Sequence, residues 1–170
     1  VYTREIPVSF SFTHENYTLN ITGRLDGLIE MNGSFSLCEI KTTEMPLNSI
    51  SRDENPAHWA QGRCYAYIVA REKELEKINL LLIYFHRDTR ESVTFEETLT
   101  LADLEKFFHS LVFPYINGLK KQHEWRNVRN LSIKTCPFPF AEFRKGQRAM
   151  SASVYRTIRD GLRLFIQAPT

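Results

Sequence analysis

The chain has 170 residues, of which 42% are hydrophobic and 25% are charged, and these shares are typical of a globular protein rather than a disordered one. Its longest wholly apolar run, Leu80 to Phe85, is far shorter than the roughly 18 residues that cross a bilayer. No basic-then-apolar signal segment opens the chain. We therefore expect a soluble protein with no membrane partner, in the cytoplasm or associated with the nucleoid.

The formal net charge of +2 conceals two parts of opposite charge. Residues 1–119 carry 11 Lys and Arg against 17 Asp and Glu, a net −6, whereas residues 120–170 carry 11 against 3, a net +8. A basic segment attached to an acidic body is typical of a protein that binds a polyanion and holds a metal ion through carboxylates. A basic linker would give the same charges, and both interpretations stay open.

The three cysteines, Cys38, Cys64 and Cys136, form no Cys-x-x-Cys pair. Their number is odd, so neither a disulfide framework nor a zinc or iron–sulfur site can be inferred from them. We expect each to be a small buried hydrophobic side chain.

Alternation of apolar and polar residues predicts three strands near the start of the chain, at 5–12, 17–30 and 35–43. A turn through residues 14–16 separates the first two strands. Asn32-Gly33, between the second and the third, is the strongest short-range hairpin signal. The sequence therefore predicts an antiparallel meander.

A change of period after this meander predicts a helix. Asn55 is expected to cap it, and Pro56 suits its first position, so the helix should cover 56–73. The largely apolar stretch at 78–86 then predicts a central strand buried on both faces, and the weaker alternation at 91–98 predicts an edge strand.

Thr100 is expected to cap a second helix, which Pro114 should disturb. The proline-rich stretch at 136–140 suits neither a helix nor a central strand, so we place a domain boundary there. Residues 141–163 return to helical spacing, and 164–168 look like a buried strand cut off at its end. Both ends of the chain look like cuts within a longer polypeptide.

The predicted hairpin brings chemistry-bearing side chains together. A tight turn at Asn32-Gly33 places Asp26 opposite Glu39 on one face of the sheet, with Lys41 projecting from the same face. The Cβ atoms of such directly opposed residues lie about 4.5–5.5 Å apart, and like charges at that separation repel each other. A protein without a bound cation would gain nothing from this pair.

Two carboxylates and an ammonium suit a hard divalent cation, because Mg²⁺ takes oxygen ligands. We expect Gly23 and Gly27 to leave room beside them. Lys41 would position or help deprotonate a metal-bound water while the metal stabilises charge on a scissile phosphate. The alternative is a surface strand whose acidic side chains are neutralised by Arg24 and Lys41, and it stays open.

The first helix carries polar side chains that point the same way. Gln61 and Tyr65 lie one turn apart, and His58 lies on nearly the same face. If this face packs beside the acidic pair, it would reach a nucleic-acid backbone or base. The alternative is an ordinary amphipathic helix that turns Trp59 and Ala66 inward.

Together these segments resemble the PD-(D/E)xK nuclease superfamily, and within it the RecB-like branch, which is related to the nucleases of CRISPR adaptation. Four elements carry the resemblance in the order of that family: Glu5-Ile-Pro-Val-Ser-Phe, Gly23-Arg-Leu-Asp26, Glu39-Ile-Lys41 and Gln61-x-x-x-Tyr65. The resemblance implies an α/β fold of restriction-endonuclease-like architecture, a mixed sheet flanked by helices.

The resemblance also implies roles for particular residues. Asp26, Glu39 and the backbone carbonyl of Ile40 would hold Mg²⁺ or Mn²⁺, and catalysis would fall to Asp26, Glu39 and Lys41. Substrate contact would fall to Gln61 and Tyr65, to which we add His58 and Arg24. No iron–sulfur cluster is expected, because the cysteines that hold one in some relatives are absent. Many family members carry a further acidic residue or histidine upstream, and this sequence begins too late to show one.

The end of the chain is similar to another family. Phe143-Arg-Lys-Gly-Gln147-Arg-Ala-Met150 and the final Gln167-Ala-Pro-Thr170 resemble the opening of a DinG/XPD-type superfamily 2 helicase. The resemblance implies an adenine contact for Gln147 in the full-length helicase. Because the sequence ends before a P-loop, we expect no ATP binding by this piece. The predicted domains are a nuclease-like domain at 1–136 and, at 137–170, a linker with a truncated helicase start.

The predicted function is that of a Mg²⁺- or Mn²⁺-dependent deoxyribonuclease, a DNA repair enzyme that hydrolyses phosphodiester bonds. Single-stranded DNA is the expected substrate, because the helicase domain of the same parent chain would supply unwound strand. One alternative is a non-cleaving DNA-binding module with a nuclease fold that loads strands for the helicase. Another is a regulatory adaptor that docks proteins through residues 137–163.

Overall fold

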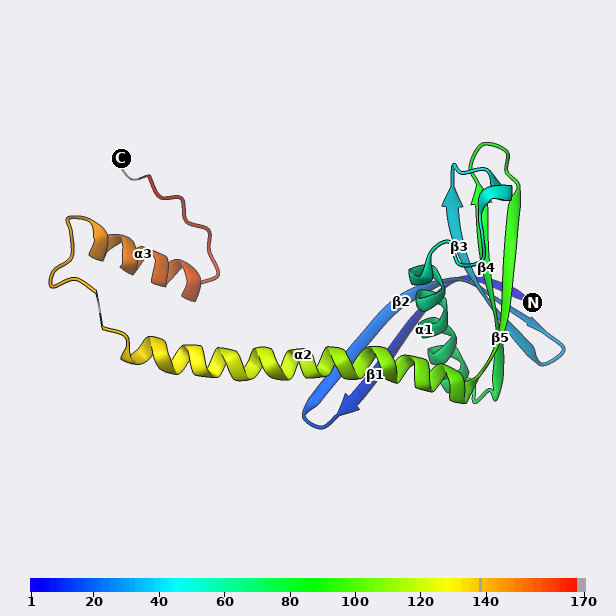
Figure 1. The fold of residues 1–170 in the computed structure, drawn as a ribbon, viewed down its shortest axis with the longest axis horizontal. Helices are drawn as coiled ribbons and strands as arrows, with labels where there is room; N and C mark the ends of the chain where they lie inside the picture. The colour runs from blue at the N-terminus through cyan, green and yellow to red at the C-terminus, as the bar shows by residue number, and fades with distance from the viewer. Residues whose placement is uncertain (138, 168–170) are drawn as a thin grey trace. The chain divides into compact units, whose positions relative to one another are not determined.

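The computed structural model describes residues 1–137 and 139–167 (Figure 1). The chain divides into two compact units, Val1–Gln122 and His123–Thr170. Compact units and evolutionary domains need not coincide, so the expected boundary after residue 136 stays a prediction. Within the described ranges, no helix is both long and apolar enough to cross a membrane.

Five strands form one mixed sheet in the first unit: β1 (Tyr2–His14), β2 (Tyr17–Met31), β3 (Ser34–Thr43), β4 (Lys77–His86) and β5 (Ser92–Thr100). Their order across the sheet is β1-β2-β3-β4-β5. β3 and β4 run parallel, and the other neighbours are antiparallel. The predicted meander, the edge position of the last strand and the α/β fold class are therefore confirmed.

The hairpin between β2 and β3 forms because Asn32 and Gly33 both adopt positive φ, at 52° and 76°. Two such residues in succession give the turn whose twist matches the flanking strands. The ladder runs from the Met31–Ser34 pair to the Gly27–Cys38 pair. The predicted register is confirmed over this stretch.

Helix α1 (Pro56–Glu72) follows a short 3₁₀ turn at Leu47–Ser49 and connects β3 to β4, which is the kind of crossover that parallel strands need. The side chain of Asn55 accepts a hydrogen bond from the Ala57 backbone N–H at 3.0 Å, which confirms the predicted cap. A Cβ atom on Gly62 would lie 2.8 Å from Leu80 Cδ1. The glycine therefore lets α1 approach β4 closely.

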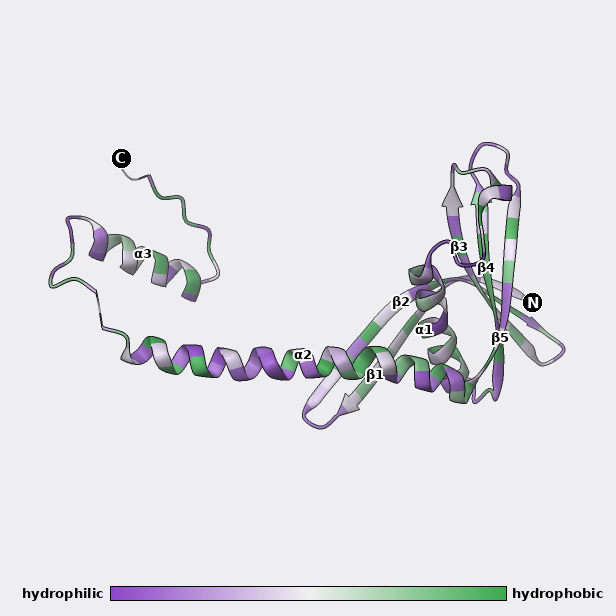
Figure 2. Cartoon of the chain, viewed as in Figure 1, coloured by the Kyte–Doolittle hydropathy of each residue, from purple (hydrophilic) through white to green (hydrophobic). Residues whose placement is uncertain are grey.

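The hydrophobic core lies between α1, the first part of helix α2 (Leu101–Thr135) and one face of the sheet. β4 contributes every second side chain to it: Ile78, Leu80, Leu82 and Tyr84. Burying a large apolar side chain contributes about 1.5–3 kcal/mol. Figure 2 shows β4 as a largely hydrophobic strand, and its opposite face is half-buried, so the prediction of burial on both faces holds in part.

Helix α2 begins at the predicted cap, where Thr100 Oγ1 accepts a hydrogen bond from the Asp103 N–H at 3.1 Å. The prediction that Pro114 disturbs this helix is wrong, because α2 continues to Thr135. The proline is exposed, and buried side chains recur every four residues on both sides of it: Leu104, Phe108, Val112 and Ile116. This packing outweighs the roughly 3 kcal/mol that a proline costs inside a helix.

The second unit contains the rest of α2 and helix α3 (Gln147–Arg159), which is shorter than the predicted 141–163. The predicted buried strand at 164–168 is wrong where it is described, because residues 164–167 have no regular secondary structure and Phe165 is 94% exposed. A strand needs a partner for its backbone groups, and no strand of the described chain pairs with this segment. Residue 168 lies outside the described residues, as does residue 138 of the expected boundary.

Candidate active site

Asp26 lies where β2 leaves its regular pairing. Leu25 and Leu28 are both buried in the core, although strict alternation would place residues three apart on opposite faces, so β2 changes phase between them. The ladder that starts at the hairpin turn ends at Gly27, so Asp26 is the first residue of β2 outside it. There the Asp26 Oδ2 atom accepts a hydrogen bond from the Ile40 backbone N–H at 2.7 Å. The carboxylate thus replaces a main-chain acceptor between the two strands.

The neighbouring strand is also distorted at this level. Glu5 of β1 adopts a φ of 51°, which is strained for a residue other than glycine. Its ladder neighbours, Arg4 and Ile6, pair with the residues on either side of Asp26. The Glu5 carboxylate accepts a hydrogen bond from Arg24 at 3.2 Å, and both side chains are largely exposed. Arg24 therefore neutralises Glu5 here, and its substrate role stays a prediction.

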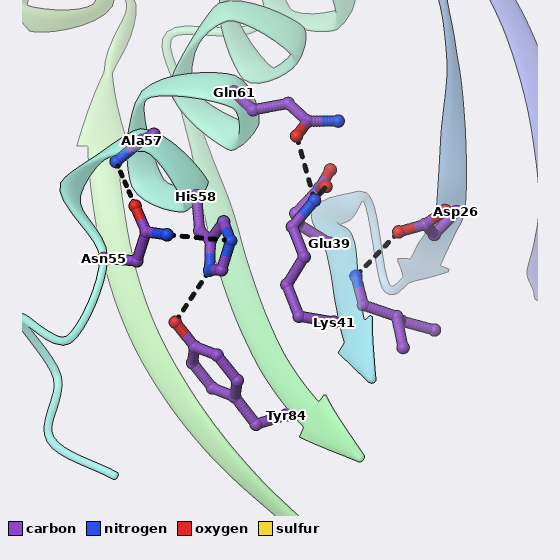
Figure 3. Close-up of polar contacts among 9 residues, drawn as sticks. Asp26, Glu39, Lys41, Asn55, Ala57, His58, Gln61 and Tyr84 are labelled. Atoms are coloured by element: carbon purple, nitrogen blue, oxygen red, sulfur yellow. Dashed lines mark hydrogen bonds and ion pairs between the residues drawn. The ribbon is translucent and has the colours of Figure 1, made fainter. Parts of the chain in front are cut away.

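Glu39 is the buried acid of the site, with 1% of its surface exposed. Its Oε1 atom lies 2.6 Å from Lys41 Nζ, and the ammonium also donates to Gln61 Oε1 at 2.9 Å. Figure 3 shows these side chains meeting between β3 and α1, with Asp26 on the adjacent strand. Burial raises the pKa of Glu39 above its ordinary value, and the Asp26 charge adds to this effect while Lys41 opposes it. The site therefore disfavours a charged Glu39.

The contact between Lys41 and Glu39 modifies the argument from repulsion. Lys41 supplies a counter-charge from within the protein, so a cation is not the sole means of relieving the two acids. The counter-charge reaches only one oxygen, because Glu39 Oε2 is buried and has no hydrogen-bond partner in the described chain. An unsatisfied buried acceptor costs about 1–3 kcal/mol. Lys41 therefore neutralises Glu39 as the surface-strand alternative expects, whereas Arg24 pairs with Glu5 instead. Glu39 Oε2 remains available as an acceptor.

The donor set fits a hard divalent cation. The carboxylates of Asp26 and Glu39 and the backbone oxygen of Ile40 are all oxygen ligands, which Mg²⁺ and Mn²⁺ prefer. The orphaned Glu39 Oε2 is the observation that supports the fit. Within the described residues, no group of three or more His, Cys, Asp or Glu side chains is arranged to hold a metal. An ion here would complete its shell with backbone, water or substrate oxygens.

Helix α1 delivers Gln61 and Tyr65 to this region, as predicted from their spacing. Gln61 reaches Lys41, and a Cβ atom on Gly23 would lie 2.5 Å from the Tyr65 hydroxyl. The expectation that Gly23 and Gly27 leave room beside the acids is wrong. Tyr65 lies against the first glycine, and the Tyr2 ring lies 2.5 Å from the position of a Cβ on the second. Both glycines are therefore close-contact positions for aromatic rings.

His58 is engaged within the protein. Its Nδ1 atom lies 2.9 Å from the Tyr84 hydroxyl, and its Nε2 atom lies 3.2 Å from the Asn55 side-chain nitrogen. Burial, with a smaller effect from the Lys41 charge, lowers the pKa of His58. Tyr84 has no signal of its own in the sequence, and its place here follows from its register with Lys41. Asn55 is predicted from the sequence only as a helix cap.

Two further expectations concern Gln147 and the three cysteines. Gln147 begins α3, where its side-chain oxygen accepts a hydrogen bond from the Arg144 N–H at 2.8 Å, and its adenine contact stays a prediction. Of the cysteines, Cys38 is buried as predicted, but Cys64 is half-buried and Cys136 is exposed. The prediction of buried thiols therefore holds for Cys38, holds in part for Cys64 and is wrong for Cys136, which follows the end of α2.

Comparisons with known proteins add to this geometry. A family model described as the PD-(D/E)XK nuclease superfamily matches residues 2–143, a range that contains every side chain drawn in Figure 3. No curated protein matches the chain. A solved structure titled "Crystal structure of SSO0001" is 22% identical, with a TM-score of 0.45. That likeness covers 66% of this chain and 50% of that one, so this chain spans half of that protein's length.

Proposed function

The chain belongs to the PD-(D/E)XK nuclease superfamily, and from the geometry of its site we propose that it hydrolyses phosphodiester bonds of DNA with Mg²⁺ or Mn²⁺. The buried Glu39 carboxylate carries this proposal, because one of its oxygens binds Lys41 and the other has no partner in the described chain. A purely structural ion pair would gain from satisfying both oxygens. A ligand site for a cation requires one of them free.

Asp26, Glu39 and the Ile40 carbonyl would hold the metal ion. When bound, the ion supplies positive charge that stabilises the negative charge developing on the scissile phosphate. The Ile40 backbone links the acids on the two strands, because its N–H already fixes the Asp26 carboxylate. One residue thus orients one acid through its N–H and would offer its own carbonyl oxygen as a ligand.

Lys41 would act on the reacting phosphate. An ammonium has three N–H donors, and Glu39 and Gln61 take two of them. The third would donate to a phosphate oxygen and stabilise the charge that grows there. In the reaction, a water oxygen bonds to phosphorus and the ester P–O bond breaks, while the water gives a proton to solvent and the leaving oxygen takes one up from solvent.

Gln61 and Tyr65 would hold the substrate in place. The Gln61 side-chain oxygen is occupied by Lys41, which leaves its amide N–H groups to donate to a phosphate or a base. Tyr65 presents a flat ring and a hydroxyl beside Gly23. The ring is half-buried against the core, so its hydroxyl would be the group that contacts the DNA backbone. Single-stranded DNA is the proposed substrate because a helicase domain of the parent chain would supply unwound strand.

The wider context is part of the proposal. The net charge of +8 at residues 120–170 favours attraction of a polyanion, and the resemblance to a helicase opening favours a parent chain that unwinds DNA. We place the nuclease domain at 1–136 and the start of the helicase domain at 137–170. Arg24 is exposed on β2 and would contact the DNA backbone.

Cleavage of labelled single- and double-stranded oligonucleotides, with and without Mg²⁺ or Mn²⁺, tests the proposal. Asp26→Asn and Lys41→Met should each reduce metal-dependent cleavage at least ~10²-fold, the usual effect of removing a charge-stabilising group. Asp103→Asn and Lys106→Met are matched controls, because that pair is exposed on α2 with its charged atoms 3.9 Å apart. Wild-type cleavage by both folded site variants would refute the proposal.

A second function is favoured by the ion pair itself. Lys41 lies 2.6 Å from Glu39, so the site is partly neutral without any metal. A DNA-binding module that keeps the nuclease fold without cleaving would also tolerate this arrangement. It would bind DNA in a salt-sensitive manner, and adding a divalent metal would produce no cleavage.

A further inference from the structure

A chain of hydrogen bonds joins the first turn of α1 to β4 beside Lys41, as Figure 3 shows. Asn55, just before the helix, contacts His58 at 3.2 Å, and His58 contacts the Tyr84 hydroxyl at 2.9 Å. Tyr84 is 4% exposed, so its end of the chain is shielded from water. Neither Tyr84 nor Asn55 has a part in the proposed chemistry so far.

The backbone settles the direction of these hydrogen bonds. The Asn55 side-chain oxygen accepts from the Ala57 N–H, so its amide nitrogen faces His58 and donates to Nε2. A histidine that accepts at Nε2 is neutral and carries its proton at Nδ1. That proton is donated to the Tyr84 hydroxyl. The helix cap thus fixes the tautomer of His58.

This chain of hydrogen bonds is linked to Lys41 in two ways, through α1 and through β4. His58 lies three residues before Gln61, one turn along α1, and Gln61 accepts the Lys41 hydrogen bond. Tyr84 is the register partner of Lys41 on the parallel neighbouring strand. These hydrogen bonds therefore fix the distance between the turn of α1 that carries Gln61 and the strand pair β3–β4 that carries Lys41.

Packing alone does not require these polar groups. Two apolar side chains would hold α1 on β4 without the desolvation of an imidazole and a phenol. Hydrogen bonds add direction and a fixed distance, which apolar contacts lack. Helix-to-strand spacing matters most where one donor has to be aimed at a reacting phosphate, since a displacement of about 1 Å there can reduce a rate ~10²-fold.

We propose that Asn55, His58 and Tyr84 form a positioning clamp that holds Gln61, and through it the Lys41 ammonium, in the geometry for catalysis. The three residues are positioning residues, because they act through Gln61 rather than on the substrate. This inference rests on the proposed function for its kinetic effect. Its structural effect, the ordering of Lys41, does not depend on the metal.

Three variants separate this role from ordinary packing. Tyr84→Phe removes only the hydroxyl and keeps the ring against Phe95. His58→Leu removes both ring contacts, and His58→Asn retains a donor close to the position of Nδ1. Tyr67→Phe is the matched control. Tyr67, like Tyr84, is a buried tyrosine, but its hydroxyl is partnered by Glu105 and it lies in the core, six residues beyond Gln61 on α1.

The kinetic readout is the split between kcat and KM on a single-stranded oligonucleotide. Tyr84→Phe should lower kcat about 10-fold and His58→Leu about 10²-fold with KM unchanged, and His58→Asn should recover part of the loss. Tyr67→Phe should leave kcat unchanged while losing a similar amount of stability. A wild-type kcat in both Tyr84→Phe and His58→Leu would overturn the proposal.

The second readout is the NMR signal of the Lys41 ammonium in ¹⁵N-lysine-labelled, metal-free protein. Two hydrogen bonds should keep this signal sharp in the wild type and in Tyr67→Phe, and loss of the clamp should broaden it in Tyr84→Phe. An unchanged signal in Tyr84→Phe would overturn the clamp whatever the kinetics show. If the wild type cleaves no DNA, the proposed function fails, yet broadening in Tyr84→Phe alone still supports the clamp.

Discussion

The contact between Gly23 and Tyr65 gives a prediction whose size follows from the structure. A Cβ atom at position 23 would lie 2.5 Å from the Tyr65 hydroxyl and 2.6 Å from its Cε1 atom. Ordinary contacts begin near 3.4 Å, so Gly23→Ala requires the end of the ring to move by about 0.9 Å, the difference between 3.4 and 2.5 Å. The variant therefore displaces Tyr65 without altering it.

The loss of stability should be small. The crowded atoms lie at the free end of a side chain, so the ring can turn away while the backbone stays in place. Overpacking costs about 1–3 kcal/mol, and the lower entropy of the unfolded chain with alanine offsets about 0.4–1 kcal/mol. A misplacement of about 1 Å at a catalytic site, in contrast, reduces a rate ~10²-fold. We expect Gly23→Ala to lose DNA cleavage about 10²-fold and remain folded.

Initial cleavage rates on a labelled oligonucleotide with Mg²⁺, together with thermal unfolding, measure both effects. Gly118→Ala is the matched control, because apart from its chain neighbours and the adjacent backbone of α2 no atom of the described chain lies within 4 Å of a Cβ at that position. It should cleave at the wild-type rate and be more stable by up to about 1 kcal/mol. Wild-type cleavage by Gly23→Ala would refute the reasoning that the placement of Tyr65 matters.

Three further predictions concern stability. Glu39→Gln should raise the melting temperature of the metal-free protein at pH 7, because burial raises the pKa of Glu39 and its charged form opposes folding. This gain should vanish as the pH falls below about 4.5, where the carboxyl is protonated in the unfolded chain as well. A gain that does not change with pH would contradict the prediction. Pro114→Ala should raise the free energy of unfolding by about 1–3 kcal/mol in denaturant titrations, because it restores a backbone hydrogen bond inside α2, and no increase would argue against a continuous helix. Glu97→Ala should lower that free energy by about 2 kcal/mol, because Arg63 donates to both Glu97 oxygens at 2.9 Å; equal stability would show that the pair contributes little.

Local signals account for what the sequence predicted well. Asn32-Gly33 determines its turn through the φ angles of two residues, and Asn55 and Thr100 cap helices through contacts two or three residues away. Strand alternation follows from one buried face, so the strands appear near the expected positions. The register from Met31 to Gly27 follows directly from the turn. The sequence alone therefore predicts that Asp26 and Glu39 lie close together.

Interactions between distant segments account for what the sequence did not predict. Asp26 leaves the ladder to bind the Ile40 N–H, a choice that depends on the twist and phase of the whole sheet. The ring of Tyr65 occupies the space beside Gly23 because α1 approaches the sheet closely. Pro114 is accommodated because the packing of α2 on the core continues past it. None of these outcomes has a signal within a few residues of the site.

The second carboxylate of the site illustrates the same limit. The sequence placed Glu39 opposite Asp26 and inferred that a cation was needed between them. In the structure Lys41 already neutralises one Glu39 oxygen, and the other is left buried without a partner in the described chain. The reason for expecting a metal is therefore the orphaned acceptor more than the repulsion. That distinction depends on side-chain conformations that spacing alone does not determine.

The most direct test of the account is a titration of the metal-free protein with Mn²⁺, followed through its backbone amide NMR signals. The paramagnetic ion should broaden the signals of Asp26, Glu39 and Ile40 first, and this pattern should disappear in Asp26→Asn. Broadening that spares these three amides, or that persists unchanged in the variant, would contradict a metal site between the two acids.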